Sequence, residues 1–291
     1  MPDLVILRAG DLQAAFVPAL GMIGSSLRHR GAELLGQRGG LEKYAASGST
    51  MGIPLLHPWA NRLAGYAYRG VTIDPANPRL HRDGNGLPMH GLLAALPWTV
   101  VERAADRLVA AFDFTAAELL AAFPFPHRLA MTVTLDPAAL HIATTLHATG
   151  DVGVPVSFGF HPYLTLPDVP RADWQIEAAV GRHLLLDPRG IPTGATAPGA
   201  VATGPLADRT FDDLYEAGAA RFTLAGGGRR LTVTFDDGYP YAQLYAPAAE
   251  PLICCEPMTA PTNALVSGTG LRTVAPGGSF SASFSIAVTT A

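Results

Sequence analysis

The segment at residues 279–288 constrains the fold more than any other part of the sequence. Its apolar side chains occupy every second position, and serines fill most of the positions between them. Because successive side chains of a strand point to opposite faces, this pattern predicts a β-strand with one buried and one solvated face. Such strands are typical of antiparallel sheets that cover a core on one side. The apolar face comprises Phe280, Ala282, Phe284, Ile286 and Val288.

Strand patterns of this kind dominate the rest of the chain. Residues 3–9 and 107–114 read as strands, and residues 129–146 read as a hairpin that turns at 136–139. A second hairpin is predicted at 231–246, with its reversal at Asp237-Gly238. Helical candidates are few and short, at 41–47 and 116–123. The sequence therefore predicts an all-β fold.

The spacing of glycine and proline indicates how many domains the chain forms. The 31 glycines and 25 prolines are scattered between the strand segments instead of being concentrated in one linker. The stretch 191–205, rich in Gly, Thr, Ala and Pro, is predicted to be a long surface loop within the domain. We therefore expect residues 1–291 to form one domain, because β-sandwiches and barrels often reach this size.

Composition narrows the possible partners. Hydrophobic residues make up 48% of the chain, charged residues 15%, and the net charge is −4. The chain has no basic stripe interleaved with aromatics, so nucleic acid is not an expected partner. No apolar stretch approaches twenty residues, and the beginning does not resemble a signal peptide. We expect a cytoplasmic protein without a membrane segment, in which the adjacent Cys254 and Cys255 are buried apolar residues.

Polar side chains occur at five places where the local pattern is apolar. Glu256 follows the run LICC and precedes a proline, and an unpaired buried carboxylate would be costly there. His161 alternates with two phenylalanines, and His90 precedes a glycine that allows a close backbone approach. The other two places are the pairs Asn61-Arg62 and Asp212-Asp213. Each has a simpler structural explanation, such as a hydrogen-bonded core histidine, a cap or a solvated turn.

Together the five places indicate a binding site for a hydroxylated ligand. They supply imidazole, carboxylate, guanidinium and amide groups, which match the many donors and acceptors of a sugar. The histidines lack the spacing of a zinc motif, so no metal is expected, and the sequence shows no phosphate loop or nucleophile elbow.

Five motifs make the sequence resemble the aldose 1-epimerase (mutarotase) family along nearly its whole length. They are HPWANRL, LPMHG followed by Trp98, FGFHPYL, FDDLY and CCEPMTAPTNA, and they occur in the family's order. The resemblance implies a large antiparallel β-sandwich, the supersandwich, and interconversion of the α and β anomers of an aldose without a cofactor. Two departures, the single glycine after His90 and Pro162-Tyr163 after His161, concern sugar preference more than reaction type.

The resemblance also implies a role for each candidate residue. Glu256 would be the catalytic base, His161 the catalytic acid, and His90 a second catalytic histidine near the ring oxygen. Substrate-binding residues would be Asn61, Arg62 and Asp212, with Asp213 as the alternative to Asp212. We expect burial to raise the pKa of Glu256 toward neutral pH and a neighbouring carboxylate to help keep His161 protonated.

Two other functions are compatible with the sequence. One is a non-catalytic carbohydrate-binding or sensing sandwich, which would not need both Glu256 and His161. The other is a sugar-6-phosphate 1-epimerase on the same fold, which would need a basic cluster at the mouth of the pocket. That cluster could come from Arg30, Arg69, Arg79 and Arg82. The segment Trp59-Ala60-Asn61 departs from the tryptophan-phenylalanine-glycine of the phosphorylated-sugar branch and so favours a free sugar.

Overall fold

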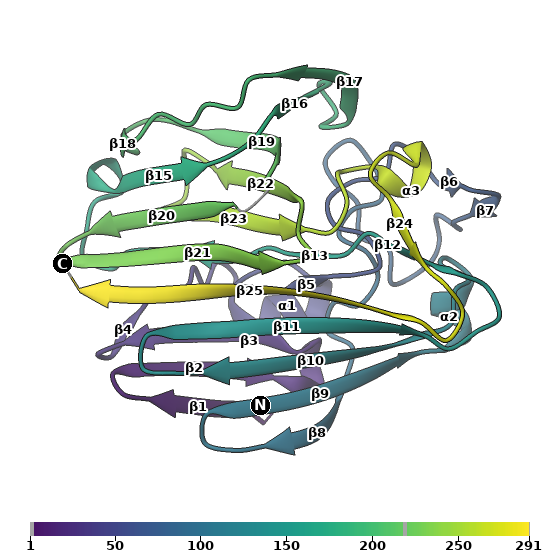
Figure 1. The fold of residues 1–291 in the computed structure, drawn as a ribbon, viewed down its shortest axis with the longest axis horizontal. Coiled ribbons are helices and arrows are strands. Elements are labelled where there is room, and N and C mark those ends of the chain that lie inside the picture. The colour runs from purple at the N-terminus through teal and green to yellow at the C-terminus, as the bar shows by residue number, and fades with distance from the viewer. Residues whose placement is uncertain (1–2, 218–219, 291) are drawn as a thin grey trace.

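The computed structural model describes residues 3–217 and 220–290, and most of its regular secondary structure is antiparallel sheet. Figure 1 shows the strands running across the molecule, with α2, α3 and the short strands β6 and β7 gathered at one end. Three sheets of nine, eight and four strands account for most of the strands. The predicted all-β sandwich with few short helices is confirmed.

The nine-stranded sheet contains the longest strands. Its central strand is β25, the segment on which the fold prediction was based. In spatial order the strands are β18 (Gly204–Pro205), β15 (Gln175–Ala179), β20 (Arg221–Gly226), β21 (Arg229–Asp237), β25 (Ser279–Thr290), β11 (Ala139–Ala148), β10 (His127–Leu135), β9 (Arg107–Phe114) and β8 (Thr99–Arg103).

The eight-stranded sheet lies opposite and carries most of the site. Its order is β17 (Pro192–Ala197), β16 (His183–Leu186), β19 (Phe211–Glu216), β22 (Tyr241–Ala246), β23 (Ile253–Met258), β13 (Gly159–Phe160) and β5 (Leu55–Leu56), with β14 (Tyr163–Leu164) also paired to β23. The four-stranded sheet is β1 (Val5–Ala9), β2 (Leu12–Val17), β3 (Ile23–His29) and β4 (Ala32–Glu33).

The remaining elements are short and lie in the connections. Two further sheets pair β12 (Val154–Val156) with β24 (Arg272–Val274) and β6 (Ala67–Tyr68) with β7 (Val71–Thr72). The helices are α1 (Gly40–Ser47), α2 (Ala117–Leu120) and α3 (Ala264–Ser267), with 3₁₀ turns at Pro18–Leu20 and Arg171–Asp173. Both predicted helices are present. In the described part of the chain, no helix has the length and hydrophobicity needed to cross a membrane.

Aromatic side chains join the two large sheets face to face. Phe160 of β13 lies 5.0 Å from Phe284 of β25, measured between ring centroids, and Phe158 lies 6.2 Å from Phe280. Along β25 the side chains of Ala282, Phe284, Ile286 and Val288 are buried, as the alternation predicted. These contacts in the core therefore hold β13 of the eight-stranded sheet against β25 of the nine-stranded sheet.

One predicted hairpin is confirmed and the other is wrong. Strands β10 and β11 pair with Leu135 opposite Leu140, as predicted for residues 129–146. At 231–246, however, β21 pairs with β20 and β25, whereas β22 pairs with β19 and β23 in the opposite sheet. The reason is Tyr239, which is buried against Phe158 and Phe284 and so carries the chain across the core after Gly238.

The predicted loop at 191–205 is also partly wrong. It is on the surface as expected, but Pro192–Ala197 forms β17 and Gly204–Pro205 forms β18, each an edge strand. An edge strand needs backbone pairing on one side only, so a composition poor in large apolar residues does not prevent it. Both cysteines are free and buried, as predicted.

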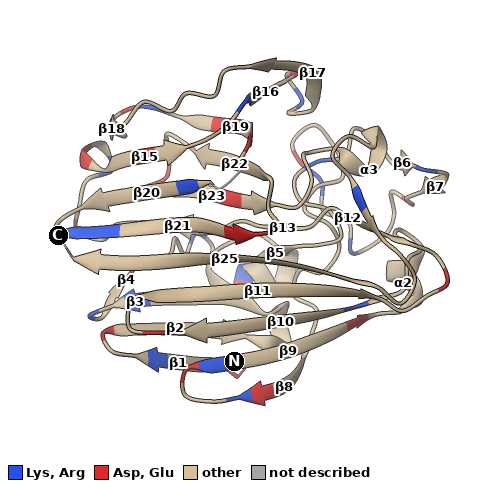
Figure 2. Ribbon diagram, in the orientation of Figure 1, with Lys and Arg blue, Asp and Glu red and all other residues tan. Residues whose placement is uncertain are grey.

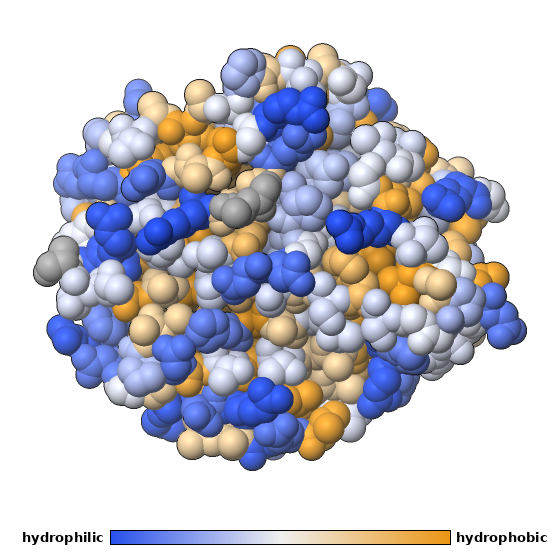
Figure 3. Space-filling view, viewed as in Figure 1, coloured by the Kyte–Doolittle hydropathy of each residue, from blue (hydrophilic) through white to orange (hydrophobic). Residues whose placement is uncertain are grey.

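Charged and polar residues cover the outside. Figure 2 shows acidic and basic residues interspersed along strand ends and connections. Figure 3 shows hydrophilic side chains spread over this face, with hydrophobic ones in small groups between them. Charge is therefore mixed over this face instead of being concentrated in one region.

Candidate active site

All six predicted site residues line one cavity of about 200 Å³, which we call the sugar cavity after the ligand class predicted from the sequence. Its floor is the middle of β23 and the adjacent β22, and its walls are the connections that follow β5 and β13. The residues are Asn61, Arg62, His90, His161, Asp212 and Glu256. Residues from all five places that the sequence singled out are thus brought together.

Glu256 lies at the bottom of this cavity and is 2% exposed. Strand alternation places Glu256 and Cys254 on one face of β23, with Cys255 toward the core between the sheets. Burial raises the pKa of Glu256 well above its usual range, and nearby Asp212 raises it further while Arg62 lowers it. The predicted direction of this shift is confirmed.

His161 contacts Glu256 directly. Its Nε2 lies 3.1 Å from Glu256 Oε1, and its ring stacks on Tyr163 at a centroid distance of 4.3 Å. Burial lowers the pKa of His161 well below the ordinary range, and the neighbouring charges of Arg38 and His90 act in the same direction. The prediction that a carboxylate would keep His161 protonated is therefore wrong in direction, because burial has the larger effect.

The opposite shifts of Glu256 and His161 have one consequence for the free site. Burial disfavours the charged form of each group, which favours a neutral carboxyl beside a neutral imidazole, with one proton on the pair. The 3.1 Å contact allows that proton to move between Oε1 and Nε2. The same pair can therefore present carboxylate with imidazolium without gaining or losing a proton.

His90 reaches the cavity through a strained backbone turn. Both His90 and Gly91 have positive φ, at 61° and 71°. A Cβ on Gly91 would lie 2.1 Å from the carbonyl oxygen of His57, which confirms the predicted close approach. The His90 ring meets His161 edge-on at 5.5 Å, and burial lowers the pKa of His90 to about 3. His90 is therefore neutral at physiological pH.

Asn61 and Arg62 form a hydrogen-bonded pair beside His90. Arg62 Nη1 donates to Asn61 Oδ1 at 2.8 Å, and Arg62 Nε donates to Asp83 at 2.8 Å. The Asn61 carbonyl oxygen accepts from the His90 backbone N–H at 2.9 Å. These bonds orient the guanidinium, whose Nη2 lies 3.9 Å from Asp212.

Strand alternation in β19 separates the two neighbouring aspartates. Asp212 lines the cavity and accepts a hydrogen bond from Gln243 Nε2 at 2.6 Å. Asp213 points to the other face, where its Oδ1 lies 3.3 Å from His183 Nε2. Of the two aspartates, Asp212 is the one that lines the sugar cavity.

The sequence missed several other residues of the cavity. Gln243 is paired across the sheet with Glu256, and Arg38 donates to the Tyr163 hydroxyl, which also bonds Thr50 at 2.6 Å. Gln243 had a detectable signal, since it interrupts the apolar segment YAQLYA. Arg38 had none, because the β4–α1 connection reaches the cavity only through the tertiary fold.

Four buried polar atoms of residues that line the cavity have no hydrogen-bond partner among the described residues. They are Glu256 Oε2, Gln243 Oε1, His90 Nδ1 and His161 Nδ1. Leaving such atoms unpaired is costly, so a ligand with several hydroxyl groups would be favoured here. Within residues 3–217 and 220–290, no three His, Cys, Asp or Glu side chains are placed to hold a metal ion.

Comparison with known proteins finds a family match over nearly the whole chain. A sequence model of the aldose 1-epimerase family matches residues 4–287. The uncharacterized Escherichia coli protein YihR is 26% identical over 245 residues, which cover 75% of each chain.

Solved structures share the fold at lower sequence identity. A galactose mutarotase-like protein from Clostridium acetobutylicum superposes with a TM-score of 0.86 at 17% identity, covering 98% of this chain and 95% of its own. Galactose 1-epimerase from Lactobacillus acidophilus superposes with a TM-score of 0.76 at 15% identity, covering 97% and 92%. At these identities the likeness describes the fold.

Proposed function

Because the chain belongs to the aldose 1-epimerase family, we propose that it interconverts the α and β anomers of a free aldose. The observation that carries the proposal is the 3.1 Å contact of Glu256 with His161 in a cavity lined by all six candidate residues. Opening the sugar ring requires removal of the proton on the anomeric hydroxyl and delivery of a proton to the ring oxygen. A paired acid and base at one place supply both.

The contact distance explains how one pair serves both oxygens. The anomeric hydroxyl and the ring oxygen are bonded to the same carbon, so they are close neighbours. Adjacent groups therefore suit this reaction, and Glu256 and His161 need not lie on opposite sides of the ring. In our proposal Glu256 takes the proton of the anomeric hydroxyl while His161 gives one to the ring oxygen.

Ring closure reverses these transfers. After rotation about the C1–C2 bond, the C5 hydroxyl attacks the aldehyde from either face, returns its proton to His161, and the new anomeric oxygen takes one from Glu256. Each full cycle therefore restores the starting protonation of the pair. His90, being neutral, would accept a hydrogen bond from the sugar, and Arg62 and Asp212 would bind hydroxyls that do not react.

The arginines around the site favour a free sugar over a sugar phosphate. Arg62 is bound to Asp83 and Asn61, Arg38 is bound to Glu250, and Arg30 is bound to Asp11 on the surface. A phosphate needs donors that are not already neutralised by carboxylates. The proposed substrate is therefore an unphosphorylated aldose.

Polarimetry of freshly dissolved α-glucose and α-galactose tests the proposal. We expect the protein to accelerate the approach to equilibrium, and Glu256→Gln to lower kcat by about 100-fold or more, because the amide cannot accept the proton. His161→Asn should have a similar effect. The exposed Glu102 provides a matched control, since Glu102→Gln changes a carboxylate far from the cavity.

The non-catalytic reading makes the opposite forecast. A carbohydrate-binding sandwich would leave every aldose at the buffer rate, and Glu256→Gln would alter only binding or melting temperature. Folded protein that binds a sugar without changing its rate of mutarotation would overturn the proposed function.

A further inference from the structure

The imidazole of His161 has polar contacts at only one of its two nitrogens. Its Nε2 lies 3.1 Å from Glu256 Oε1 and 3.4 Å from the Tyr163 hydroxyl oxygen, whereas its Nδ1 has no hydrogen-bond partner among the described residues. In an active-site histidine, the hydrogen bond at the second nitrogen typically fixes the tautomer and the direction of the ring. The orientation of His161 must therefore come from the groups that pack against its ring.

Tyr163 makes the broadest of these contacts. The two rings are stacked, with centroids 4.3 Å apart and planes inclined by 14°. Tyr245 and His90 meet the His161 ring edge-on instead, at 5.8 and 5.5 Å. Stacking is one of the preferred arrangements of two aromatic rings, and it fixes the plane of each. Tyr163 therefore holds the plane in which His161 Nε2 faces Glu256.

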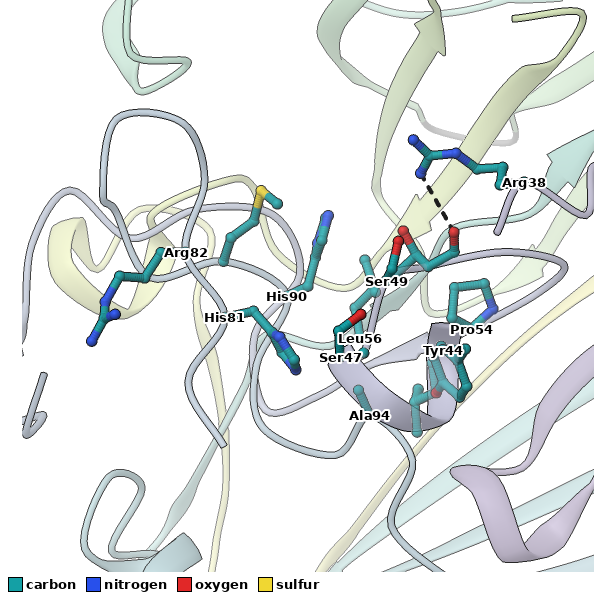
Figure 4. A pocket seen from close by; sticks show the side chains of 14 residues that line it. Arg38, Tyr44, Ser47, Ser49, Pro54, Leu56, His81, Arg82, His90 and Ala94 are labelled. Carbon is teal, nitrogen blue, oxygen red and sulfur yellow. Dashed lines mark hydrogen bonds between the residues drawn. The ribbon is translucent and has the colours of Figure 1, made fainter. Parts of the chain in front are cut away.

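Tyr163 is held in turn by bonds at its hydroxyl group. The hydroxyl oxygen lies 2.6 Å from Thr50 Oγ1 and accepts a hydrogen bond from Arg38 Nη1 at 3.2 Å. Arg38 also lies over the Tyr163 ring, with its Cζ 5.2 Å from the centroid. A further bond from Arg38 Nη1 to the Thr50 carbonyl oxygen, of 3.4 Å, is the dashed line in Figure 4. One tyrosine ring therefore contacts both His161 and the guanidinium of Arg38.

Glu250 fixes the guanidinium of Arg38. Arg38 Nε and Nη2 donate to the two carboxylate oxygens of Glu250, at 3.0 and 3.2 Å. Such a bidentate pair holds a guanidinium in one orientation as well as attracting it. Glu250 lies in the connection between β22 and β23. A chain of contacts therefore leads from this connection through Arg38 and Tyr163 to His161.

We propose that Tyr163 and Arg38 are positioning residues for His161, with Tyr163 acting through its ring and Arg38 through its charge. This inference rests on the proposed function, in which His161 is the acid. Burial lowers the pKa of His161 most, and the charges of His90 and Arg38 lower it further. Removing the charge of Arg38 should therefore make His161 easier to protonate. It would also leave the Glu250 carboxylate unpaired, which acts in the same direction.

Other titratable and charged side chains also face His161 and act on its protonation. Of the two arginines near the ring, Arg62 has a proposed role in substrate binding, so Arg38 is the one whose charge can be varied without removing a proposed sugar ligand. Asp212 of β19 lines the same cavity. The groups that face the ring are Glu256 of β23, Tyr163 of β14, Tyr245 of β22, and His90, Arg62 and Arg38 of the connections.

The pH profile of kcat/KM tests the charge of Arg38. Arg38→Met removes the charge and keeps most of the length of the side chain. We expect the acidic limb of the profile to move to higher pH, because a charge that opposed protonation of His161 is gone. Arg38→Lys keeps a positive charge, so its acidic limb should stay close to that of the wild type. An acidic limb that does not move in Arg38→Met, or that moves equally in both variants, would overturn the role of the charge.

Substitutions of Tyr163 test the stacked ring. Tyr163→Phe keeps the ring and should keep kcat within about threefold of the wild type, since it loses only hydrogen bonds. Tyr163→Leu removes the ring, so the imidazole can turn away from Glu256. We expect kcat to fall by about tenfold or more at nearly unchanged KM, because small misplacements of reacting groups are costly. A rise in KM at unchanged kcat would make Tyr163 a substrate-binding residue and overturn its positioning role.

Thr50→Val is a second variant, in case Tyr163→Leu fails to fold. It removes the 2.6 Å bond to the Tyr163 hydroxyl and should lower kcat by about threefold without raising KM. An unchanged kcat in Thr50→Val would overturn the chain of contacts. Arg128→Met is the control for Arg38→Met, since Arg128 is paired with the exposed Asp113 on the nine-stranded sheet, at 2.7 Å. A shift of the acidic limb in this control equal to that in Arg38→Met would also overturn the proposal.

An NMR titration of the ligand-free protein separates failure of this inference from failure of the enzyme function. Long-range proton–nitrogen spectra report the protonation of each imidazole, and the His161 signal is assigned by its absence in His161→Asn. If no sugar is converted, the proposed function is wrong, but the titration of His161 still tests the charge of Arg38. Protonation of His161 at higher pH in Arg38→Met than in the wild type and Arg38→Lys would support the proposal. Identical behaviour of the three proteins would overturn it.

Discussion

At the scale of single residues, the sugar cavity is a set of buried groups whose charges are balanced locally. Burial favours the neutral form of Glu256, which lies 3.1 Å from His161, whereas Asp83 neutralises the charge of Arg62. An unpaired charge buried this deeply would be unstable, because the cost of removing it from water is not offset by attraction to an opposite charge. The exposed Asp212, by contrast, remains available to a ligand. The same balance decides how each substitution should act.

Substitution of the hydroxyl-binding residues should affect binding more than turnover. Asp212→Asn keeps the shape and the hydrogen bond from Gln243 but removes a charged acceptor, and Arg62→Ala removes a charged donor. Hydrogen bonds to charged groups contribute about 1.5–3 kcal/mol, so KM should rise by about tenfold or more. Steady-state kinetics over a range of sugar concentrations measure this.

A fall in kcat at unchanged KM would contradict the binding roles of Arg62 and Asp212. Arg62→Ala also deprives Asp83 of its partner, so its melting temperature must be measured as well. Asp212→Asn is free of that complication and is the cleaner of the two variants.

The pH dependence of activity should show a broad plateau. In the proposed mechanism the active enzyme carries one proton on the pair, so activity should be lost when His161 gains a second proton or when Glu256 loses the first. Burial lowers the pKa of His161 and raises that of Glu256. The acidic limb of the pH–activity profile should therefore lie below the ordinary pKa of histidine, and the alkaline limb above the ordinary pKa of glutamate. We expect kcat/KM, corrected for the buffer rate, to be flat through neutral pH. An acidic limb near 6.5, the ordinary value for histidine, would contradict the shared proton.

At the scale of elements, strand alternation made much of the fold predictable. β25, β10 and β11 show this alternation, β1 and β9 contain short apolar runs, and all five segments are strands. Alternation does not reveal which strand pairs with which. It shows only which side chains of a strand face the core, and not which strand lies beside it in the sheet. Residues 231–246 illustrate this, since a turn at Gly238 fits either a hairpin or a crossing between sheets. The buried Tyr239 decided in favour of the crossing.

The same limit applies to the candidate site. Glu256, His161, His90, Asn61, Arg62 and Asp212 were detectable because each is a polar group where the local pattern is apolar. Arg38 lies in a polar segment, where an arginine has no local reason to attract attention. Its place beside Tyr163 follows from the packing of the β4–α1 connection against β14.

The turn at Gly91 should be sensitive to a single methyl group. Its φ of 71° is unfavourable for any other residue, and a Cβ would overlap the His57 carbonyl oxygen. We expect Gly91→Ala to lower the free energy of unfolding by about 2 kcal/mol or more and to displace His90 from the cavity. Chemical denaturation and kcat measure the two effects. Gly86→Ala is the control, since it also has positive φ but has open space around its Cα.

If Gly91→Ala left kcat unchanged in folded protein, His90 would not depend on this turn for its position. A loss of kcat in Gly86→Ala equal to that in Gly91→Ala would indicate a general effect of strain in the connection instead.

At the scale of the whole molecule, one core unites the sheets. A continuous cluster of buried side chains includes residues from the nine-, eight- and four-stranded sheets, such as Phe284, Phe160 and Phe16. We propose that residues 1–291 therefore fold as a single domain, which predicts one cooperative calorimetric transition. Two separate transitions would contradict this.

The stability of that core should depend on acid through a buried histidine pair. His57 and His127 share a hydrogen bond of 2.8 Å between their Nε2 atoms, and His127 Nδ1 donates to the Phe125 carbonyl at 2.6 Å. His57 therefore donates and His127 accepts, so both rings are neutral. Phe114 stacks on His127 at 4.6 Å and contributes to the apolar surroundings. Burial lowers the pKa of His127 to about 4, and lowers that of His57 well below its usual range.

The sign of the effect follows from these lowered values. Between about pH 6.5 and pH 4 the unfolded chain binds protons that the folded chain does not. The free energy of unfolding should therefore decrease as the pH is lowered through that window. For His127 alone the loss approaches about 3 kcal/mol at the acid end. The double variant His57→Leu, His127→Phe replaces both partners by apolar groups, so it should keep its stability at pH 8 and lose less of it at pH 4.5. Denaturation curves at both values decide the matter, because an unchanged difference between them would show that the pair contributes nothing to the acid sensitivity of the core.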